Sequence, residues 1–156
     1  MPPLPQGMSA PRWLLARMMS PGQPVRFIYQ PPDEPAGLRV LHLYDRDGYD
    51  IGRLIWQVCH ACQRARINKI SITNDWQRRG LGRRLIARAL HDGPGCTWVT
   101  SGQSPDAKRF FAIISTETGI AFTERGASCT HMNTDRRYVP PAKRQRPPRP
   151  TLDRTV

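Results

Sequence analysis

One stretch decides the expected fold: Ile70-Ser71-Ile72-Thr73-Asn74-Asp75-Trp76-Gln77-Arg78-Arg79-Gly80-Leu81-Gly82. Ile70 and Ile72 alternate with polar residues, which is the period-two pattern of a half-buried strand. From residue 81 to residue 90 the apolar side chains instead recur on one helical face, with the arginines mostly on the other. The stretch therefore predicts a strand, a tight basic turn and a helix, in that order.

Gly80 and Gly82 stand where this turn meets the helix. Glycine lets the backbone approach a ligand closely, and the first N–H groups of a helix have no partner within it. Together with the helix dipole, these donors favour an anion. The Lys-Ser/Thr of a Walker A loop and the third glycine of a dinucleotide fingerprint are both missing. The turn predicts a phosphate site of another kind, with an ordinary Gly- and Arg-rich strand-to-helix turn as the alternative.

The hexapeptide Gln77-Arg78-Arg79-Gly80-Leu81-Gly82 resembles the (Gln/Arg)-x-x-Gly-x-(Gly/Ala) signature of the GCN5-related N-acetyltransferases. In that family the loop binds the pyrophosphate of acetyl-coenzyme A through backbone amides. The resemblance implies that the end of the preceding strand meets the acetyl and pantetheine part, and that a second helix flanks the pantetheine arm. It assigns coenzyme binding to Ile72, Thr73, Asn74, Gln77, Arg78, Arg79, Gly80, Leu81, Gly82, Arg83, Ser104, Ala107 and Phe111.

The second helix is expected to begin after Ser104, which can serve as its N-cap, with Pro105 in the first helical position and Gly119 at its end. This segment resembles the second coenzyme motif of the family, with two departures. Phe111 stands where the family usually has the tyrosine that protonates the departing thiolate, and Ser104 or Gln103 stands at the usual asparagine. The acid would then be another group, such as Ser104, Ser115 or a water.

Attack of an amine on a thioester needs a deprotonated amine, donors for the developing oxyanion and an acid for the thiolate. Backbone N–H groups near Ile72 and Asn74 are the expected oxyanion donors. No residue is singled out as the base: Asp75, Glu117 and Asp47 are candidates, and each also reads as a solvated surface carboxylate. The catalytic candidates are therefore Asp75, Ser104 and Ser115, without a choice among them.

The cysteines form a second group of candidate residues. Cys59-x-x-Cys62 has metal-ligand spacing, and Cys129-x-His131 adds a second pair later in the chain. The four would form a tetrahedral structural zinc site, for which His60 and Cys96 are substitute ligands. The alternative is a reduced Cys-x-x-Cys turn without metal.

The remaining patterns predict an α+β (α/β) fold similar to that of the acetyltransferases. We expect a mixed, mostly antiparallel central sheet with helices on both faces and a shortened N-terminal part. The strand over 96–100 should be parallel to that over 64–73, because a helix connects them. The expected helices cover 12–19, 81–90 and 105–118, and the expected strands cover 25–29, 38–44, 51–58, 64–73, 96–100, 120–123 and 128–132.

The chain has 156 residues and a net charge of +12, which suits one domain. We expect a flexible N-terminus over 1–11, an acetyltransferase-like domain over 12–135 and a disordered Pro/Arg-rich tail over 136–156. The tail could contact nucleic acid or simply aid solubility. No apolar run approaches the roughly 20 residues of a membrane span, and the start does not resemble a signal peptide. These features predict a cytoplasmic protein without membrane contact.

The expected function is transfer of an acetyl group from acetyl-coenzyme A to an amine of a small molecule, peptide or protein. A non-catalytic acyl-coenzyme A-binding module and a nucleic-acid-associated, tRNA-directed acetyltransferase are the alternatives. Only one helix precedes the expected sheet, whereas the family usually has two there. The acceptor site would therefore be shallow or completed by a second subunit of a homodimer.

Overall fold

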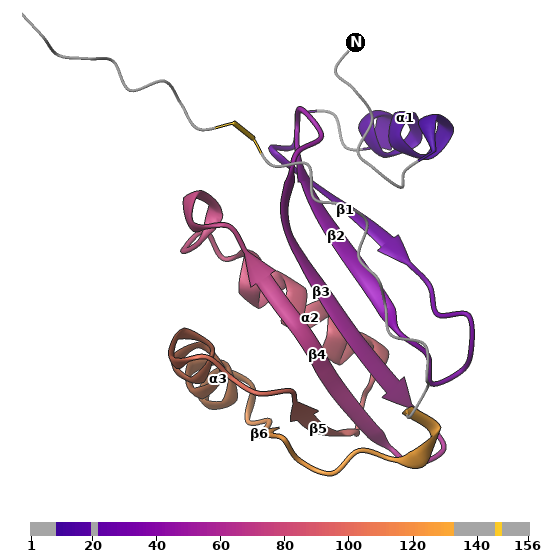
Figure 1. The fold of residues 1–156 in the computed structure, drawn as a ribbon, viewed down its shortest axis with the longest axis vertical. Coiled ribbons are helices and arrows are strands. Elements are labelled where there is room, and N and C mark those ends of the chain that lie inside the picture. Colours follow the sequence, from indigo (N-terminus) through magenta and orange to yellow (C-terminus); the bar gives the residue numbers. More distant parts are fainter. Residues whose placement is uncertain (1–8, 20–21, 133–145, 148–156) are drawn as a thin grey trace, which may run out of the picture.

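A computed structural model describes residues 9–19, 22–132 and 146–147 (Figure 1). The helices are α1 (Ala10–Met19), α2 (Leu81–Asp92) and α3 (Pro105–Thr118), with short 3-10 turns η1 (Asn74–Trp76) and η2 (Thr130–Met132). The strands are β1 (Val25–Gln30), β2 (Arg39–Asp45), β3 (Asp50–Cys59), β4 (Arg64–Ile72), β5 (Thr97–Thr100) and β6 (Phe122–Glu124).

The strands form one six-stranded sheet in which neighbours in sequence are neighbours in space. β1 to β4 are antiparallel, and β4, β5 and β6 are parallel to one another. The predicted mixed α+β architecture and the predicted parallel pairing after the first crossover helix are both confirmed. The parallel pairs arise because α2 and α3 carry the chain back to the starting end of the sheet.

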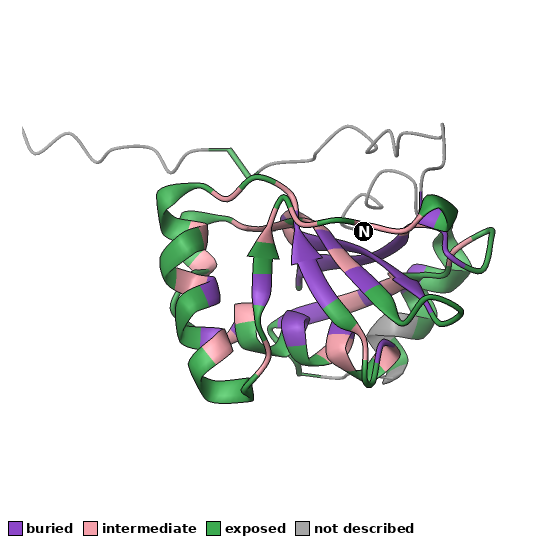
Figure 2. Ribbon diagram, turned by 90° about the horizontal axis from the view of Figure 1, so that it is seen from below, coloured by how far each residue is buried: buried purple, intermediate pink, exposed green. Residues whose placement is uncertain are grey.

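The main core lies between the sheet and the two crossover helices (Figure 2). Leu85 and Ile86 of α2, and Ile114 of α3, pack there against apolar side chains of the strands. On the other face, Trp13 of α1 packs with Ile28 and Tyr44 in a separate small cluster. Helices therefore cover both faces, as predicted.

β4 has different neighbours along its two halves. It pairs with β3 from Arg64 to Ile72 but with β5 only from Arg64 to Ile67. Beyond Ile67, β5 turns away through Ser101, whose N–H donates to the Ile67 carbonyl and whose hydroxyl donates to that of Asn68. The last part of β4 consequently has an edge that no strand of the described residues pairs, called the free edge below.

The C-terminal part departs from expectation. The predicted strand over 128–132 is wrong, because this segment folds into the turn η2, closed by the N–H of Met132 donating to the Cys129 carbonyl. The strand expected over 120–123 starts later, at Phe122. At the other end, α1 begins at Ala10, inside the segment expected to be flexible.

Most of the expected tail lies outside the described residues, and so do residues 1–8. Arg146 is described, and its guanidinium lies 2.9 Å from an Asp45 carboxylate oxygen and 2.6 Å from one of Asp47. Among the described residues, no helix combines the length and the apolarity that crossing a membrane requires.

Gln57 joins the sheet to two loops. Its amide N–H groups donate to the carbonyls of Ala36 and Met132, its oxygen accepts from Asn68, and its side chain is buried.

Gln57→Ala should cost about 1–3 kcal/mol of unfolding free energy, because the Ala36 and Met132 carbonyls lose their donor. Urea denaturation measures the loss. Asn68→Ala should cost less, since Asn68 is half-buried; equal midpoints for wild type and Gln57→Ala would contradict this account.

Candidate functional site

The part of β4 beyond Ile67 has backbone N–H groups on its β5 side that no strand of the described sheet pairs. The N–H of Thr73 donates to the Ile51 carbonyl, so Thr73, Ser71 and Lys69 direct their backbone groups toward β3. Ile70 and Ile72 therefore direct theirs the other way, where no strand of the described sheet pairs with them. Of these two, Ile72 is a position that the sequence resemblance assigns to the coenzyme, whereas Ile70 was not among the predicted residues.

The turn after β4 brings this edge to the start of α2. The side-chain amide of Gln77 donates to the Ile72 carbonyl at 2.9 Å and to the Asn74 side-chain oxygen at 3.2 Å, which closes the turn over η1. Arg78 and Gly80 both have left-handed backbones, with φ of 60° and 78°. Gly80 is the N-cap of α2, and no side chain caps the helix. A Cβ atom at Gly80 would meet nothing within 4 Å, so the helix start is open.

Gly82 has a different role from Gly80. A Cβ atom there would lie 2.8 Å from the ring of Phe110, so Gly82 is needed for the close approach of α3 to the first turn of α2. Both glycines were expected to allow close approach of a ligand. In the structure Gly80 is open to a ligand, whereas Gly82 is packed against Phe110.

The arginines of the loop do not all lie free. Arg83 donates from two nitrogens to the Glu117 carboxylate, at 2.8–3.2 Å. This ion pair lowers the pKa of Glu117, which makes it a weaker base. Arg79 stacks over the Trp76 ring, 4.6 Å from its centroid. Of the loop arginines, Arg78 is exposed and has no ion pair to another described residue.

α3 supplies the remaining predicted coenzyme residues. Ser104 caps the helix by accepting from the N–H of Ala107 at 3.2 Å, as its sequence position predicted. Ala107 is half-buried against the core. Phe111 is only 4% exposed and packs on Phe122, so its side chain belongs to the core. Leu81 is likewise buried beneath the loop.

The structure does not bring the catalytic candidates together into one acid–base arrangement. Asp75 is exposed within η1, and the hydroxyl of Ser104 is occupied as a helix cap. Ser115 lies near the C-terminal end of α3, half-buried. Asp47 pairs with Arg146 at the turn between β2 and β3. None of these placements identifies a general base.

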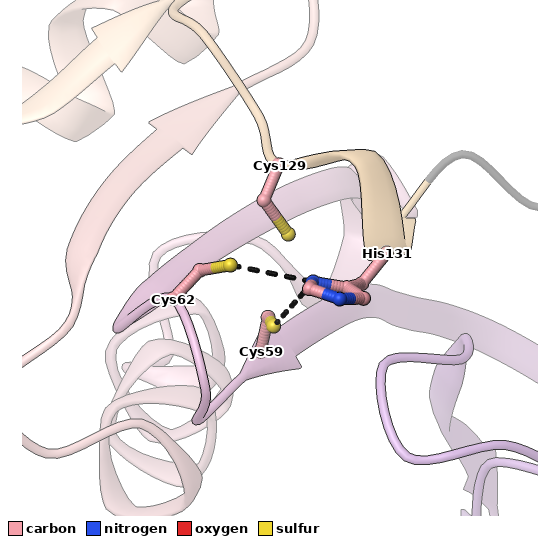
Figure 3. Close-up of side chains that lie close together, drawn as sticks. All are labelled: Cys59, Cys62, Cys129 and His131. Atoms are coloured by element: carbon pink, nitrogen blue, oxygen red, sulfur yellow. Dashed lines mark hydrogen bonds between the residues drawn. The ribbon is translucent and has the colours of Figure 1, made fainter.

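A second candidate site lies at the opposite end of β4. Cys59 ends β3, Cys62 lies in the turn to β4, and Cys129 and His131 come from the segment of η2. Their ligand atoms all lie within 4.8 Å of one another, and Figure 3 shows the side chains pointing toward a common centre. The sulfurs of Cys59 and Cys62 are 3.6 and 3.3 Å from Nδ1 of His131. The cluster could hold a metal ion.

Neighbouring contacts hold the two halves of this cluster together. Gln57 donates to the Met132 carbonyl, and Arg64 donates to the Ala127 carbonyl at 3.0 Å. Met132 packs with buried Cys59. Sequence reasoning missed Gln57 and Arg64, although a glutamine among the apolar residues of a strand was a possible signal of a buried polar contact.

The donor set fits a tetrahedral ion. Two ligand atoms on a zinc ion are on the order of 3.6 Å apart when one is sulfur and the other imidazole nitrogen. The pKa of Cys59 is lowered by the backbone N–H of Cys62, whereas that of Cys62 is raised to about 11, chiefly because it hydrogen-bonds to Cys59. A thiolate at Cys59 thus disfavours deprotonation of the Cys62 thiol. A bound cation would favour the thiolate form of both cysteines. His60 and Cys96 lie outside the group.

Comparison with protein-family models and with curated proteins finds no match to this chain.

The packing of Gly82 makes a testable prediction. Gly82→Ala should lower the melting temperature by several degrees, because the new methyl group clashes with Phe110 and overpacking costs about 1–3 kcal/mol. Adding Phe110→Leu should recover part of the loss, as measured by thermal unfolding. A Gly82→Ala variant as stable as wild type would mean that α3 does not rest on this glycine.

Proposed function

We propose that the chain binds acetyl-coenzyme A at the end of β4 and transfers its acetyl group to an amine, as an enzyme similar to the GCN5-related N-acetyltransferases. One observation carries the proposal: the free edge of β4 leads through a short turn into the uncapped start of α2. A thioester needs directed backbone groups, and a pyrophosphate needs the open N–H groups of a helix start. Both lie here within one strand–turn–helix unit.

The order of elements supports this proposal. A β-hairpin, a third antiparallel strand, a helix, a parallel strand and a second helix follow one another as in the family resembled by residues 77–82. The contact of Gly82 with Phe110 and the Arg83–Glu117 ion pair place α3 beside the loop. Under this proposal the coenzyme lies between the β4 edge and α3.

Each part of the unit has a chemical role under this proposal. The N–H groups of Ile70 and Ile72 stabilise the oxyanion that forms when the amine attacks. The N–H groups of Gly80 to Arg83 hold the pyrophosphate, with Arg78 adding charge. Phe111 supplies no proton, so the leaving thiolate takes one from solvent. The acceptor amine loses its proton through water, since none of the candidate carboxylates in the described part of the chain is positioned as a direct base.

A matched pair of variants tests the phosphate position. Asn and Asp both tolerate the left-handed backbone of Gly80 and differ by one charge. Gly80→Asp should weaken acetyl-coenzyme A binding at least about tenfold relative to Gly80→Asn, because the carboxylate repels the pyrophosphate. Isothermal titration calorimetry measures both affinities.

The two variants should melt at similar temperatures, since nothing lies within 4 Å of the new side chain's Cβ. Equal affinities for acetyl-coenzyme A in the pair would remove the loop as the phosphate site. Binding without release of thiol across a panel of amines would favour the non-catalytic binding module.

We also propose that the Cys59–Cys62–Cys129–His131 cluster holds a structural zinc ion. Four protein ligands leave no open position, which is typical of structural sites, and sulfur with imidazole suits zinc. Bound there, the ion would fasten the η2 segment to the turn between β3 and β4.

Protein purified without a polyhistidine tag should contain about one zinc ion per chain. Cys62→Ser and Cys129→Ser should lose the metal and melt several degrees lower, because metal binding adds to folding free energy. Cys96→Ser is the matched control and should keep the ion, since Cys96 lies outside the cluster. Elemental analysis and thermal unfolding give both readouts, and wild-type protein free of stoichiometric metal would overturn the assignment.

A further inference from the structure

A row of side chains crosses the sheet on the face turned away from α2 and α3. Ile28 pairs with His42, His42 with Arg53 and Arg53 with Ser71, from β1 through β4. Paired residues in antiparallel strands place their side chains on the same face. The adjoining row, which includes Leu41 and Leu54, lies on the opposite face in the main core. The polar members of the first row therefore share one surface of the sheet.

Arg53 is the unusual member of this row. It is only 2% exposed, and its Nη2 atom is buried without a hydrogen-bond partner among the described residues. Within residues 9–19, 22–132 and 146–147, no carboxylate lies within ion-pair distance of its guanidinium. A buried charge costs several kcal/mol unless an opposite charge compensates it. The described chain does not supply that charge.

His42, which is paired with Arg53, also has a buried polar atom whose hydrogen-bonding capacity is unused by the described residues. Its Nδ1 atom is buried and has no hydrogen-bond partner in the part of the chain that the structure describes. Its pKa falls to about 4, first because burial disfavours the imidazolium and then because Arg53 and Arg12 lie nearby. His42 is therefore neutral at pH 7 and can donate from one ring nitrogen without adding charge. Arg53 and His42 together present buried donors to an anion.

The position of this pair relates it to the proposed chemistry. Ser71, which is paired with Arg53, lies in the part of β4 that has the free edge. Adjacent strands are about 4.8 Å apart, so Arg53 lies roughly one strand spacing from that edge. A group bound at Arg53 would thus sit close to the place where the acetyl carbonyl is proposed to bind.

We infer that Arg53 and His42 bind the acidic group of the acetyl acceptor, which is a small amine carrying a carboxylate or phosphate a few bonds from its nitrogen. The inference rests on the proposed acetyl transfer and specifies its acceptor. The anion neutralises Arg53 and accepts from His42, while the amine reaches across one strand spacing to the β4 edge. Larger amines without an acidic group leave the buried charge uncompensated and are disfavoured.

Anion binding is tested first without any coenzyme. The His42 ring protons are followed by NMR across pH, in acetate, in inorganic phosphate and in chloride at equal ionic strength. A carboxylate or phosphate at Arg53 should raise the pKa of His42 by about 1 relative to chloride, because it favours the imidazolium. The acetate and phosphate arms show which acidic group the site prefers. An unchanged pKa in both would overturn the proposal whether or not acetyl-coenzyme A binds.

Selectivity among acceptors is tested second. Thiol release from acetyl-coenzyme A is compared for β-alanine, 2-aminoethyl phosphate and propylamine. An acidic amine should exceed propylamine at least about tenfold in kcat/KM, mostly through KM, and Arg53→Met should abolish this preference. Equal preference in wild type and Arg53→Met would overturn the assignment.

Arg109→Met is the matched control, since Arg109 is exposed on α3; it should keep the preference for acidic amines. Arg53→Met should melt at or above the wild-type temperature, because it removes a buried charge that lacks a partner. A large fall in melting temperature would instead identify Arg53 as a structural cation and contradict the proposal. The wild-type His42 titration tests anion binding independently of this variant.

Discussion

Pairing between β4 and β5 ends at Ile67 and Thr100, while β4 continues beside β3 to Ile72. The free edge of β4, which leads into the start of α2, depends on this divergence of β4 and β5. Ser101 enforces it by donating twice to the β4 backbone just as the chain leaves the sheet. The side-chain amide of Gln103 then donates to the Thr100 hydroxyl, and the backbone N–H of Gln103 donates to the Glu124 carboxylate. The turn is thus held by specific contacts, and the β4 edge stays uncovered by β5.

The two candidate sites occupy opposite ends of β4. The thiol–imidazole cluster lies before Arg64, and the loop with Gly80 follows Ile72. β4 has nine residues between these ends, and a strand rises about 3.3 Å per residue, so the two sites are separated by most of the sheet. A metal at the cluster is therefore too far from the loop to polarise a thioester, which is consistent with a purely structural role.

Much of this arrangement follows from local patterns in the sequence. The alternation in Ile70–Thr73, the apolar face of residues 81–90 and the Ser104 cap each specify an element through short-range contacts. Their places were predicted within a few residues. The clustering of the four candidate metal ligands was also predicted, because Cys59-x-x-Cys62 and Cys129-x-His131 have spacings that are typical of metal ligands. Local signals of this kind need no knowledge of tertiary packing.

Features that depend on distant partners were harder to foresee. Residues 128–132 alternate like a strand, but carbonyl contacts with Gln57 and the cysteine cluster override that propensity and produce η2. Arg53 and His42 lie in apparently ordinary strands, and only the register across β2, β3 and β4 shows that they share one face. Gly82 has the sequence context of a ligand-binding glycine, but in the structure the ring of Phe110 lies beside it. In each case the missing information was a contact between segments far apart in the chain.

The strand order has a consequence for how the protein acquires its structure. Each strand pairs with the strand that precedes it in the chain, so the sheet can grow from its N-terminal edge as synthesis proceeds. The cysteine–histidine cluster is different, because its halves are separated by 69 and 72 residues. Closing so long a loop carries an entropic cost that sequential strand addition avoids. We therefore expect the contacts between the two halves of the cluster to form last, after the sheet has formed.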